Sequence, residues 1–166
     1  MVKIITGKIN SGKTTKLESI YHKNNIGDGF ISKKIMIGTD VFGFKARRLS
    51  DGYETMFMLH NRYFFEDKII SITDDDLTYD YEIGPYKVLS KALKVIDETF
   101  NMLINDLVSP LYFDEVGKLE ISGLGYAKYI EQAIRNNLDV YLVVREDLID
   151  SIIRKFDITE YLIVRL

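Results

Sequence analysis

Residues 7–14, Gly7-Lys8-Ile9-Asn10-Ser11-Gly12-Lys13-Thr14, fit the pattern G-x-x-x-x-G-K-[ST] without a gap. Gly7 and Gly12 let the backbone turn tightly and approach phosphate oxygens with no side chain in between. The amides of such a loop, and those at the start of the following helix, point inward as anion donors. Lys13 adds a positive charge for the β- and γ-phosphates, and the Thr14 hydroxyl is suited to hold Mg²⁺. The stretch predicts a loop that binds the phosphates of a nucleotide.

The residues on either side supply the context that this loop requires. Residues 2–6 form a short apolar run typical of a buried strand, and residues 13–23 can form a helix with Leu17 and Ile20 facing inward. A strand that leads into the loop and a helix that begins within it aim the loop amides at one point. We therefore expect the nucleotide to bind at Gly7, Lys8, Ile9, Asn10, Ser11, Gly12, Lys13, Thr14 and Thr15.

A second candidate site follows another apolar run, Leu111-Tyr112-Phe113, which ends in Asp114 and Glu115. A phosphate loop needs a carboxylate to complete the Mg²⁺ shell, and the usual one is an Asp at the end of a buried strand. We expect Thr14 and Asp114 to hold Mg²⁺, with Asp114 acting through a bound water. Glu115 lies one residue further and is placed to orient and deprotonate a water, so Glu115 and Lys13 are the expected catalytic residues. A glutamate directly after the strand aspartate is typical of NTP-hydrolysing proteins of the additional-strand group.

The order of the elements predicts an α/β fold, a three-layer sandwich with a mainly parallel sheet. An antiparallel β insertion is expected around residues 29–59, where Asp51-Gly52 is a strong hairpin signal between two β segments. Residues 61–84 read mostly as a loop with one short strand, and residues 86–107 show the clearest helical periodicity. The other expected elements are helices over 126–136 and 146–156 and strands over 140–144 and 161–164. The chain, 1–166, has the length of a single domain.

Composition excludes several classes of protein. Lys and Arg number 22 against 25 Asp and Glu, which disfavours a protein that binds nucleic acid through its phosphate backbone. The absence of cysteine excludes disulfides, thiolate metal sites and a cysteine nucleophile. The longest apolar runs are much shorter than the roughly 20 residues of a membrane-spanning helix. The apolar run near residue 1 is also too short to be the core of a signal peptide. We expect a cytoplasmic monomer whose partner is a nucleoside triphosphate, with no membrane and no nucleic acid.

Four segments of the sequence, in order, resemble the THEP-type, or cancer-related, nucleoside-triphosphatase family. The last of them is similar to the family's I-D-E-I-G-x-M-E-L-x-S stretch and is the most specific. They cover roughly the first 130 residues and consist of Gly7 to Thr15, Gly29-Phe30 with Gly38 and Gly43-Phe44, Ile83-Gly84-Pro85-Tyr86, and Phe113 to Ser122.

The resemblance implies a P-loop NTPase fold and Mg²⁺-dependent hydrolysis of ATP, GTP and other nucleoside triphosphates to the diphosphate and phosphate. By position it assigns Lys13 and Thr14 to the phosphate site, and Asp114 and Glu115 to the metal and water site. It also places Gly117 and Lys118 among the nucleotide-binding residues, and Glu120 in the family signature.

The sequence departs from the family where cations are often found. Met36 and Asp40 stand where the family often has arginines. The neighbouring cations Lys33, Lys34, Arg47 and Arg48 are candidates to replace them, and Arg145, which ends a predicted parallel strand, is a candidate to contact the γ-phosphate. Tyr86 is a candidate to stack on the base.

Two other functions remain open at this point, because a phosphate loop alone does not distinguish between them. The same loop could serve a nucleotide or small-molecule kinase, with an acceptor pocket formed by residues 29–59. It could also serve a low-turnover nucleotide-binding regulatory module.

Overall fold

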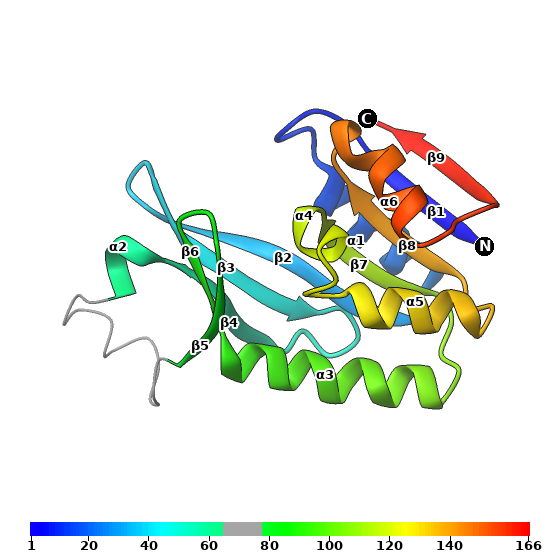
Figure 1. Cartoon of the computed structure of the whole chain (residues 1–166), viewed down its shortest axis with the longest axis horizontal. Helices are drawn as coiled ribbons and strands as arrows, with labels where there is room; N and C mark the ends of the chain where they lie inside the picture. Colours follow the sequence, from blue (N-terminus) through cyan, green and yellow to red (C-terminus); the bar gives the residue numbers. More distant parts are fainter. Residues whose placement is uncertain (65–77) are drawn as a thin grey trace.

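The structure is a computed structural model that describes residues 1–64 and 78–166. In this part of the chain nine strands form one sheet in the order β5-β6-β4-β3-β2-β7-β8-β1-β9 (Figure 1). The strands are β1 (Val2–Thr6), β2 (Asp28–Ile37), β3 (Asp40–Arg48), β4 (Glu54–His60), β5 (Tyr79–Ile83), β6 (Tyr86–Leu89), β7 (Leu111–Val116), β8 (Val140–Val144) and β9 (Tyr161–Arg165).

The parallel half of the sheet is formed by β2, β7, β8, β1 and β9, which pair in parallel throughout. β8 lies between β1, which leads into the phosphate loop, and β7, which carries the two acids. All five residues of β8 are buried, as expected for a strand covered on both faces.

Helices cover both faces of the parallel half. α1 (Lys13–Asn24) lies on one face, and α3 (Ser90–Asn105), α5 (Ala127–Arg135) and α6 (Ile149–Lys155) lie on the other (Figure 1). Because successive side chains of a strand point to opposite faces, each strand feeds two cores. Ile5 of β1 packs with Leu17 under α1, whereas Ile4 belongs to the larger core on the other side. The predicted mixed α/β architecture, with helices on both faces of the sheet, is confirmed.

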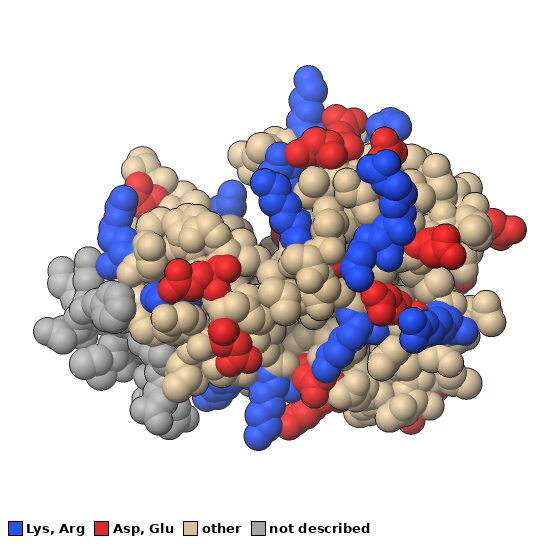
Figure 2. Space-filling model, viewed as in Figure 1, with Lys and Arg blue, Asp and Glu red and all other residues tan. Residues whose placement is uncertain are grey.

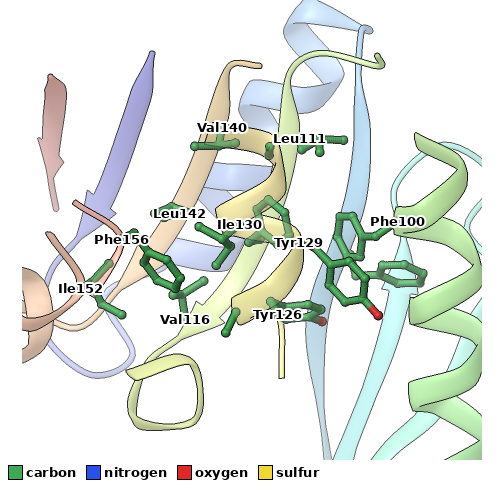
Figure 3. Packing of buried hydrophobic residues seen from close by; sticks show 14 of the residues in the cluster. Phe100, Leu111, Val116, Tyr126, Tyr129, Ile130, Val140, Leu142, Ile152 and Phe156 are labelled. Carbon is green, nitrogen blue, oxygen red and sulfur yellow. The ribbon is translucent and has the colours of Figure 1, made fainter. Parts of the chain in front are cut away.

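The larger core is centred on aromatic rings between α3, α5 and β7. Phe100 of α3 stacks on Phe113 of β7 with ring centroids 4.6 Å apart. It also stacks on Tyr129 of α5 at 5.1 Å (Figure 3). Tyr126 meets the Phe100 ring edge-on at 5.7 Å. These contacts fix the helix pair against the strand whose end carries Asp114.

The antiparallel half is larger than the sequence indicated. The expected hairpins between β2, β3 and β4 are present, and β6 and β5 add two further antiparallel strands beyond residue 59. The short strand expected in residues 61–84 corresponds to β5, and α2 (Asn61–Phe64) follows β4 directly. The remainder of that segment, with the acidic run at 74–76, lies outside the described residues.

The helix expected from Tyr86 to Leu107 begins four residues later, at Ser90, and ends at Asn105. Residues 86–89 form β6, which pairs with β4 and β5. Leu89 fits the helical repeat and also the alternation of a strand. The helical pattern in the sequence therefore extends over residues 86–89, which form a strand in the structure. Pairing with two neighbouring strands outweighs the local helical preference.

Within the described ranges, no helix is both long and apolar enough to cross a membrane.

The first hairpin of the antiparallel half is fastened to the parallel half by a buried carboxylate. Asp28, at the start of β2, is 3% exposed and accepts hydrogen bonds from both the amide and the hydroxyl of Ser50, at 3.1 and 2.7 Å. It also pairs with Arg48 at 2.7 Å and accepts the Gly29 amide at 2.8 Å. Asp28 thus holds the end of β3 against the start of β2.

We expect Asp28→Asn to lower the free energy of unfolding by about 1.5 to 3 kcal/mol, because it weakens hydrogen bonds to a charged and buried acceptor. Asp51→Asn is the matched control, since the exposed Asp51 contacts the same Arg48 at 3.4 Å. A surface pair contributes about 1 kcal/mol or less. Urea unfolding of both variants measures the difference, and equal losses would show that Asp28 does not fasten the hairpin.

Candidate active site

The phosphate loop occupies residues 7–12, between the end of β1 and the start of α1. Gly12 precedes the helix with φ of 87°, a left-handed conformation that favours glycine. Gly7 has little space, because a Cβ there would lie 2.8 Å from the Leu166 carbonyl oxygen and 2.7 Å from Ser11 Oγ. Asn10 also adopts positive φ, at 62°. The strand–loop–helix context expected for the motif is therefore present.

Lys13 lies inside the curve of the loop. Its side chain is buried, with 8% of the residue exposed, and Nζ donates to the Lys8 carbonyl at 2.7 Å and the Gly7 carbonyl at 3.2 Å. The ammonium group is thus held at the concave side of the loop, where phosphate oxygens would lie. Ser11 also belongs to the loop, and its Oγ is buried without a hydrogen-bond partner.

Asp114 joins three segments of the chain. Its Oδ2 accepts the Thr14 hydroxyl of α1 at 2.8 Å and the Ser32 amide of β2 at 2.9 Å, and its Oδ1 accepts the Glu115 amide at 3.0 Å. The residue is 1% exposed, and burial raises the pKa of its carboxyl to about 7, with a further increase from the charge of Glu115. A buried carboxylate of this kind is stabilised by a nearby cation.

Glu115 leaves the regular strand. Between two paired positions, β7 has two residues, Asp114 and Glu115, where β8 has the single residue Val143, which makes a β-bulge. Glu115 has φ of 55°, a conformation that is uncommon for residues other than glycine. In a regular strand the two acids would point to opposite faces. The bulge instead brings both to the wall of the same cavity.

That cavity has a volume of about 600 Å³ and lies between the phosphate loop, the end of β7 and the antiparallel half. Figure 2 shows a notch in the outline between the antiparallel half and the part of the molecule that carries the phosphate loop. One end is polar and is formed by the loop and the acids. The other is apolar and aromatic. Its wall includes Ile9, Asn10, Lys13, Ser32, Lys34, Phe44, Ala46, Phe57, Met58, Tyr86, Asp114, Glu115, Gly117, Lys118, Glu120, Tyr126 and Arg145.

A short helix, α4 (Lys118–Ile121), forms the rim of the cavity beyond Glu115. Glu120 is 2% exposed, and its two oxygens accept the Gly117 amide at 2.7 Å and the Tyr126 amide at 3.1 Å. Burial raises the pKa of Glu120. Its hydrogen bonds close the segment from 117 to 126 into a compact turn, and Gly117 and Lys118 lie on the cavity wall.

The candidate cations fall into two groups, those that pair with carboxylates away from the cavity and those that line it. Lys33 and Arg47 both pair with Glu18 at 3.0 Å, and Arg48 pairs with Asp28, so these three are held by carboxylates. Lys34 lines the cavity and forms no ion pair with a carboxylate of residues 1–64 or 78–166. Arg145 also lines the cavity and pairs with Asp147 through two contacts of 3.0 and 3.1 Å.

Met36 and Asp40, which stand where the family often has arginines, lie near the tip of the β2–β3 hairpin. Met36 is exposed, and Asp40 pairs with Arg62 at 2.9 Å.

Most of the expected site residues meet at this cavity or directly beside it. Lys13, Asp114, Glu115, Gly117 and Lys118 are on its wall, and Thr14 contacts Asp114. The sequence reasoning did not find Ser32, because its contribution is a backbone amide and any residue would supply one. It also did not find the apolar wall from Phe57 and Tyr126.

Mg²⁺ fits the oxygen donors of Thr14 and Asp114. Among residues 1–64 and 78–166, no group of three or more His, Cys, Asp or Glu side chains could hold a metal ion by itself. Mg²⁺ often binds through one or two protein oxygens together with the phosphates of its nucleotide. The donors present at this site are of that type.

Comparisons with known proteins find one matching family and one similar solved structure. The sequence matches the family NTPase_1, described as NTPase, over residues 3–165. The fold resembles the solution structure of a human cancer-related nucleoside triphosphatase, with a TM-score of 0.63 and 18% sequence identity over 98% of this chain and 87% of that chain. A search of curated protein sequences finds no significant match.

At 18% identity the structural likeness shows that the two chains share a fold. The match to the family extends over nearly the whole chain and confirms the resemblance found in the sequence. The protein therefore belongs to the NTPase family NTPase_1.

Proposed function

We propose that the protein hydrolyses nucleoside triphosphates, ATP and GTP among them, to the diphosphate and phosphate in a Mg²⁺-dependent reaction. The observation that carries the proposal is the hydrogen bond of 2.8 Å between Thr14 and Asp114, directly beside the bulged Glu115. It joins the phosphate loop to the end of β7 at the point where a metal–phosphate complex would be held.

Lys13 and the loop amides bind and orient the triphosphate in this proposal. Lys13 Nζ would exchange its two carbonyl acceptors for oxygens of the β- and γ-phosphates, a stronger charge-assisted contact. Thr14 Oγ1 and Asp114 are the protein groups that would hold Mg²⁺. When bound, the ion would neutralise charge on the β- and γ-phosphate oxygens.

Glu115 is the group that we propose to activate water. Its side chain is exposed to the cavity that also contains Lys13 and Asp114, so it can receive a proton from a water aligned with the γ-phosphate. Its positive φ is a local strain of the kind that is common at functional sites. We further propose that Arg145, at the end of β8, contacts the γ-phosphate in place of the family arginines.

A phosphate-release assay with ATP, GTP, CTP and UTP distinguishes this function from the two alternatives. Release without any acceptor supports a hydrolase, release only with an added acceptor supports a kinase, and tight binding with almost no release supports a regulatory module.

Lys13→Ala is expected to raise the dissociation constant of Mg²⁺–NTP by about 10- to 150-fold, because a charge-assisted hydrogen bond contributes about 1.5 to 3 kcal/mol. Calorimetry with a non-hydrolysable analogue measures this. Lys16→Ala, at an exposed position in the same helix, is the control and should bind like the wild type. Equal affinities of the two variants would remove Lys13 from the phosphate site.

Asp114→Asn is expected to lower turnover and its magnesium dependence, and at the same time to leave stability unchanged or to raise it. The asparagine oxygen keeps the Ser32 amide, and the removal of a buried carboxylate whose pKa is raised by burial offsets the loss of the acceptor for the Glu115 amide. Magnesium titrations of the rate and thermal unfolding of the nucleotide-free protein measure the two effects. A wild-type magnesium dependence in the variant would exclude Asp114 from the metal shell.

Glu115→Gln is expected to reduce single-turnover phosphate release by about 10²- to 10⁴-fold, the usual contribution of a general base. The affinity for Mg²⁺ and a non-hydrolysable analogue should change only slightly, because the amide keeps the shape of the side chain. Glu98→Gln on the exposed face of α3 is the control. If both variants hydrolyse at the wild-type rate, Glu115 does not activate the water.

A further inference from the structure

The apolar end of the cavity is lined by residues other than those proposed to hold the triphosphate. This end, the aromatic arm, is formed by Phe44 and Ala46 of β3, Phe57 and Met58 of β4, Tyr86 of β6, and Tyr126. The whole cavity, at about 600 Å³, is in the range of small-molecule sites, roughly 300 to 1,000 Å³.

The phosphate loop indicates which end of a nucleotide faces the arm. In this motif the backbone amides of the loop cradle the α- and β-phosphates, and the lysine reaches the β- and γ-phosphates. Lys13, Asp114 and Glu115 all line the cavity. These are the groups proposed to meet the γ-phosphate and its attacking water, so the cavity opens on the γ-phosphate side of the proposed site and the arm extends beyond them.

The walls of the arm are suited to a flat ring. Phe44 and Tyr86 meet edge-on with centroids 5.4 Å apart, and the Phe57 ring is inclined by 28° to that of Tyr126 with centroids 6.3 Å apart. Aromatic side chains in such arrangements favour further aromatic partners. Ala46, two residues from Phe44 on β3, is buried and contributes only a methyl group to the cavity wall.

Lys34 of β2 supplies a cation at the outer end of the arm. Lys34 and Ser32 lie two residues apart on β2, so they share one face of the strand at a spacing of about 7 Å. Ser32 donates its amide to Asp114, which places Lys34 further from the metal and phosphate site. Lys34 is exposed and, unlike Lys33 beside it, is not held by Glu18.

We propose that the aromatic arm binds a second small molecule, a planar aromatic compound with one anionic group, at the same time as the nucleotide. The ring lies between Phe44, Tyr86 and Tyr126, and the anionic group pairs with Lys34 at the outer end. This proposal rests on the proposed nucleotide site, because the phosphate loop defines which side of the cavity is left for a second ligand.

The test uses anilinonaphthalene sulfonate, an aromatic anion whose fluorescence rises in an apolar site. It is titrated into the protein saturated with Mg²⁺ and a non-hydrolysable NTP analogue, and into the protein alone. We expect saturable binding in both cases. Lys34→Glu should weaken it by about 3- to 10-fold at low salt, the range for losing an exposed ion pair and gaining a repulsion. Lys23→Glu makes the same charge change at the exposed end of α1 and should have no effect.

Ala46→Leu should abolish the saturable binding by filling the arm, with thermal unfolding as the check that the variant folds. Tyr86→Ala, at a half-buried position, gives an independent measure and should weaken binding by about 2- to 10-fold through loss of an aromatic contact.

Unchanged binding in Lys34→Glu, or in both Ala46→Leu and Tyr86→Ala, would overturn the proposal. Competitive displacement of the probe by the analogue would also overturn it, since the arm would then hold the base. The titration of the protein alone does not require nucleotide binding or hydrolysis. A failure of the proposed NTPase activity, read from phosphate release, is therefore separate from a failure of the arm.

Discussion

The carboxylate of Asp114 is the contact on which the arrangement of the site depends. One of its oxygens accepts hydrogen bonds from Thr14 at the start of α1 and from the Ser32 amide of β2, while the residue itself ends the regular part of β7. Three segments that are far apart in the sequence are thereby held at one point. The phosphate loop is fixed relative to both halves of the sheet, so the cavity has a phosphate end and an apolar end in a defined relation.

The placement of two acids beside that loop depends on a backbone irregularity rather than on residue type. A regular strand would point Asp114 and Glu115 to opposite faces of the sheet. The bulge against β8 and the positive φ of Glu115 bring both onto one wall. The adjacent strand β8 has its own residue at this edge, Arg145, so three charged side chains come from two neighbouring strand ends. Ligands of parallel sheets bind at this carboxyl edge.

The sequence predicted the elements that follow from local residue patterns. It did not predict those that depend on hydrogen bonding between strands far apart in the sequence. The phosphate loop, the buried strands and the hairpin at Asp51-Gly52 follow from residue types at fixed spacing. Leu89 fits the periodicity of a helix as well as that of a strand, so the sequence predicts a helix over residues 86–89. These residues form a strand because they pair with β4 and β5. The contribution of Ser32 is a main-chain amide, which leaves no trace in the sequence. The apolar wall comes from three strands whose order the sequence does not specify. The assignment of a role to each site residue remains a prediction.

Two buried carboxylates in the same sheet differ in whether the protein supplies a charged partner. Asp28 is buried at one end of β2 and has its own cation, Arg48, together with the amide and hydroxyl of Ser50. Asp114 is buried still more deeply and accepts from a hydroxyl and two amides, none of them charged, and its pKa is raised to about 7. A buried carboxylate with a cation and hydrogen bonds inside the protein has its desolvation cost offset, whereas one that is buried without a charged partner costs stability unless a ligand supplies the charge. Asp114 faces a cavity that also contains Lys13, so a metal–triphosphate complex would supply the missing cation and satisfy the lysine in the same binding event.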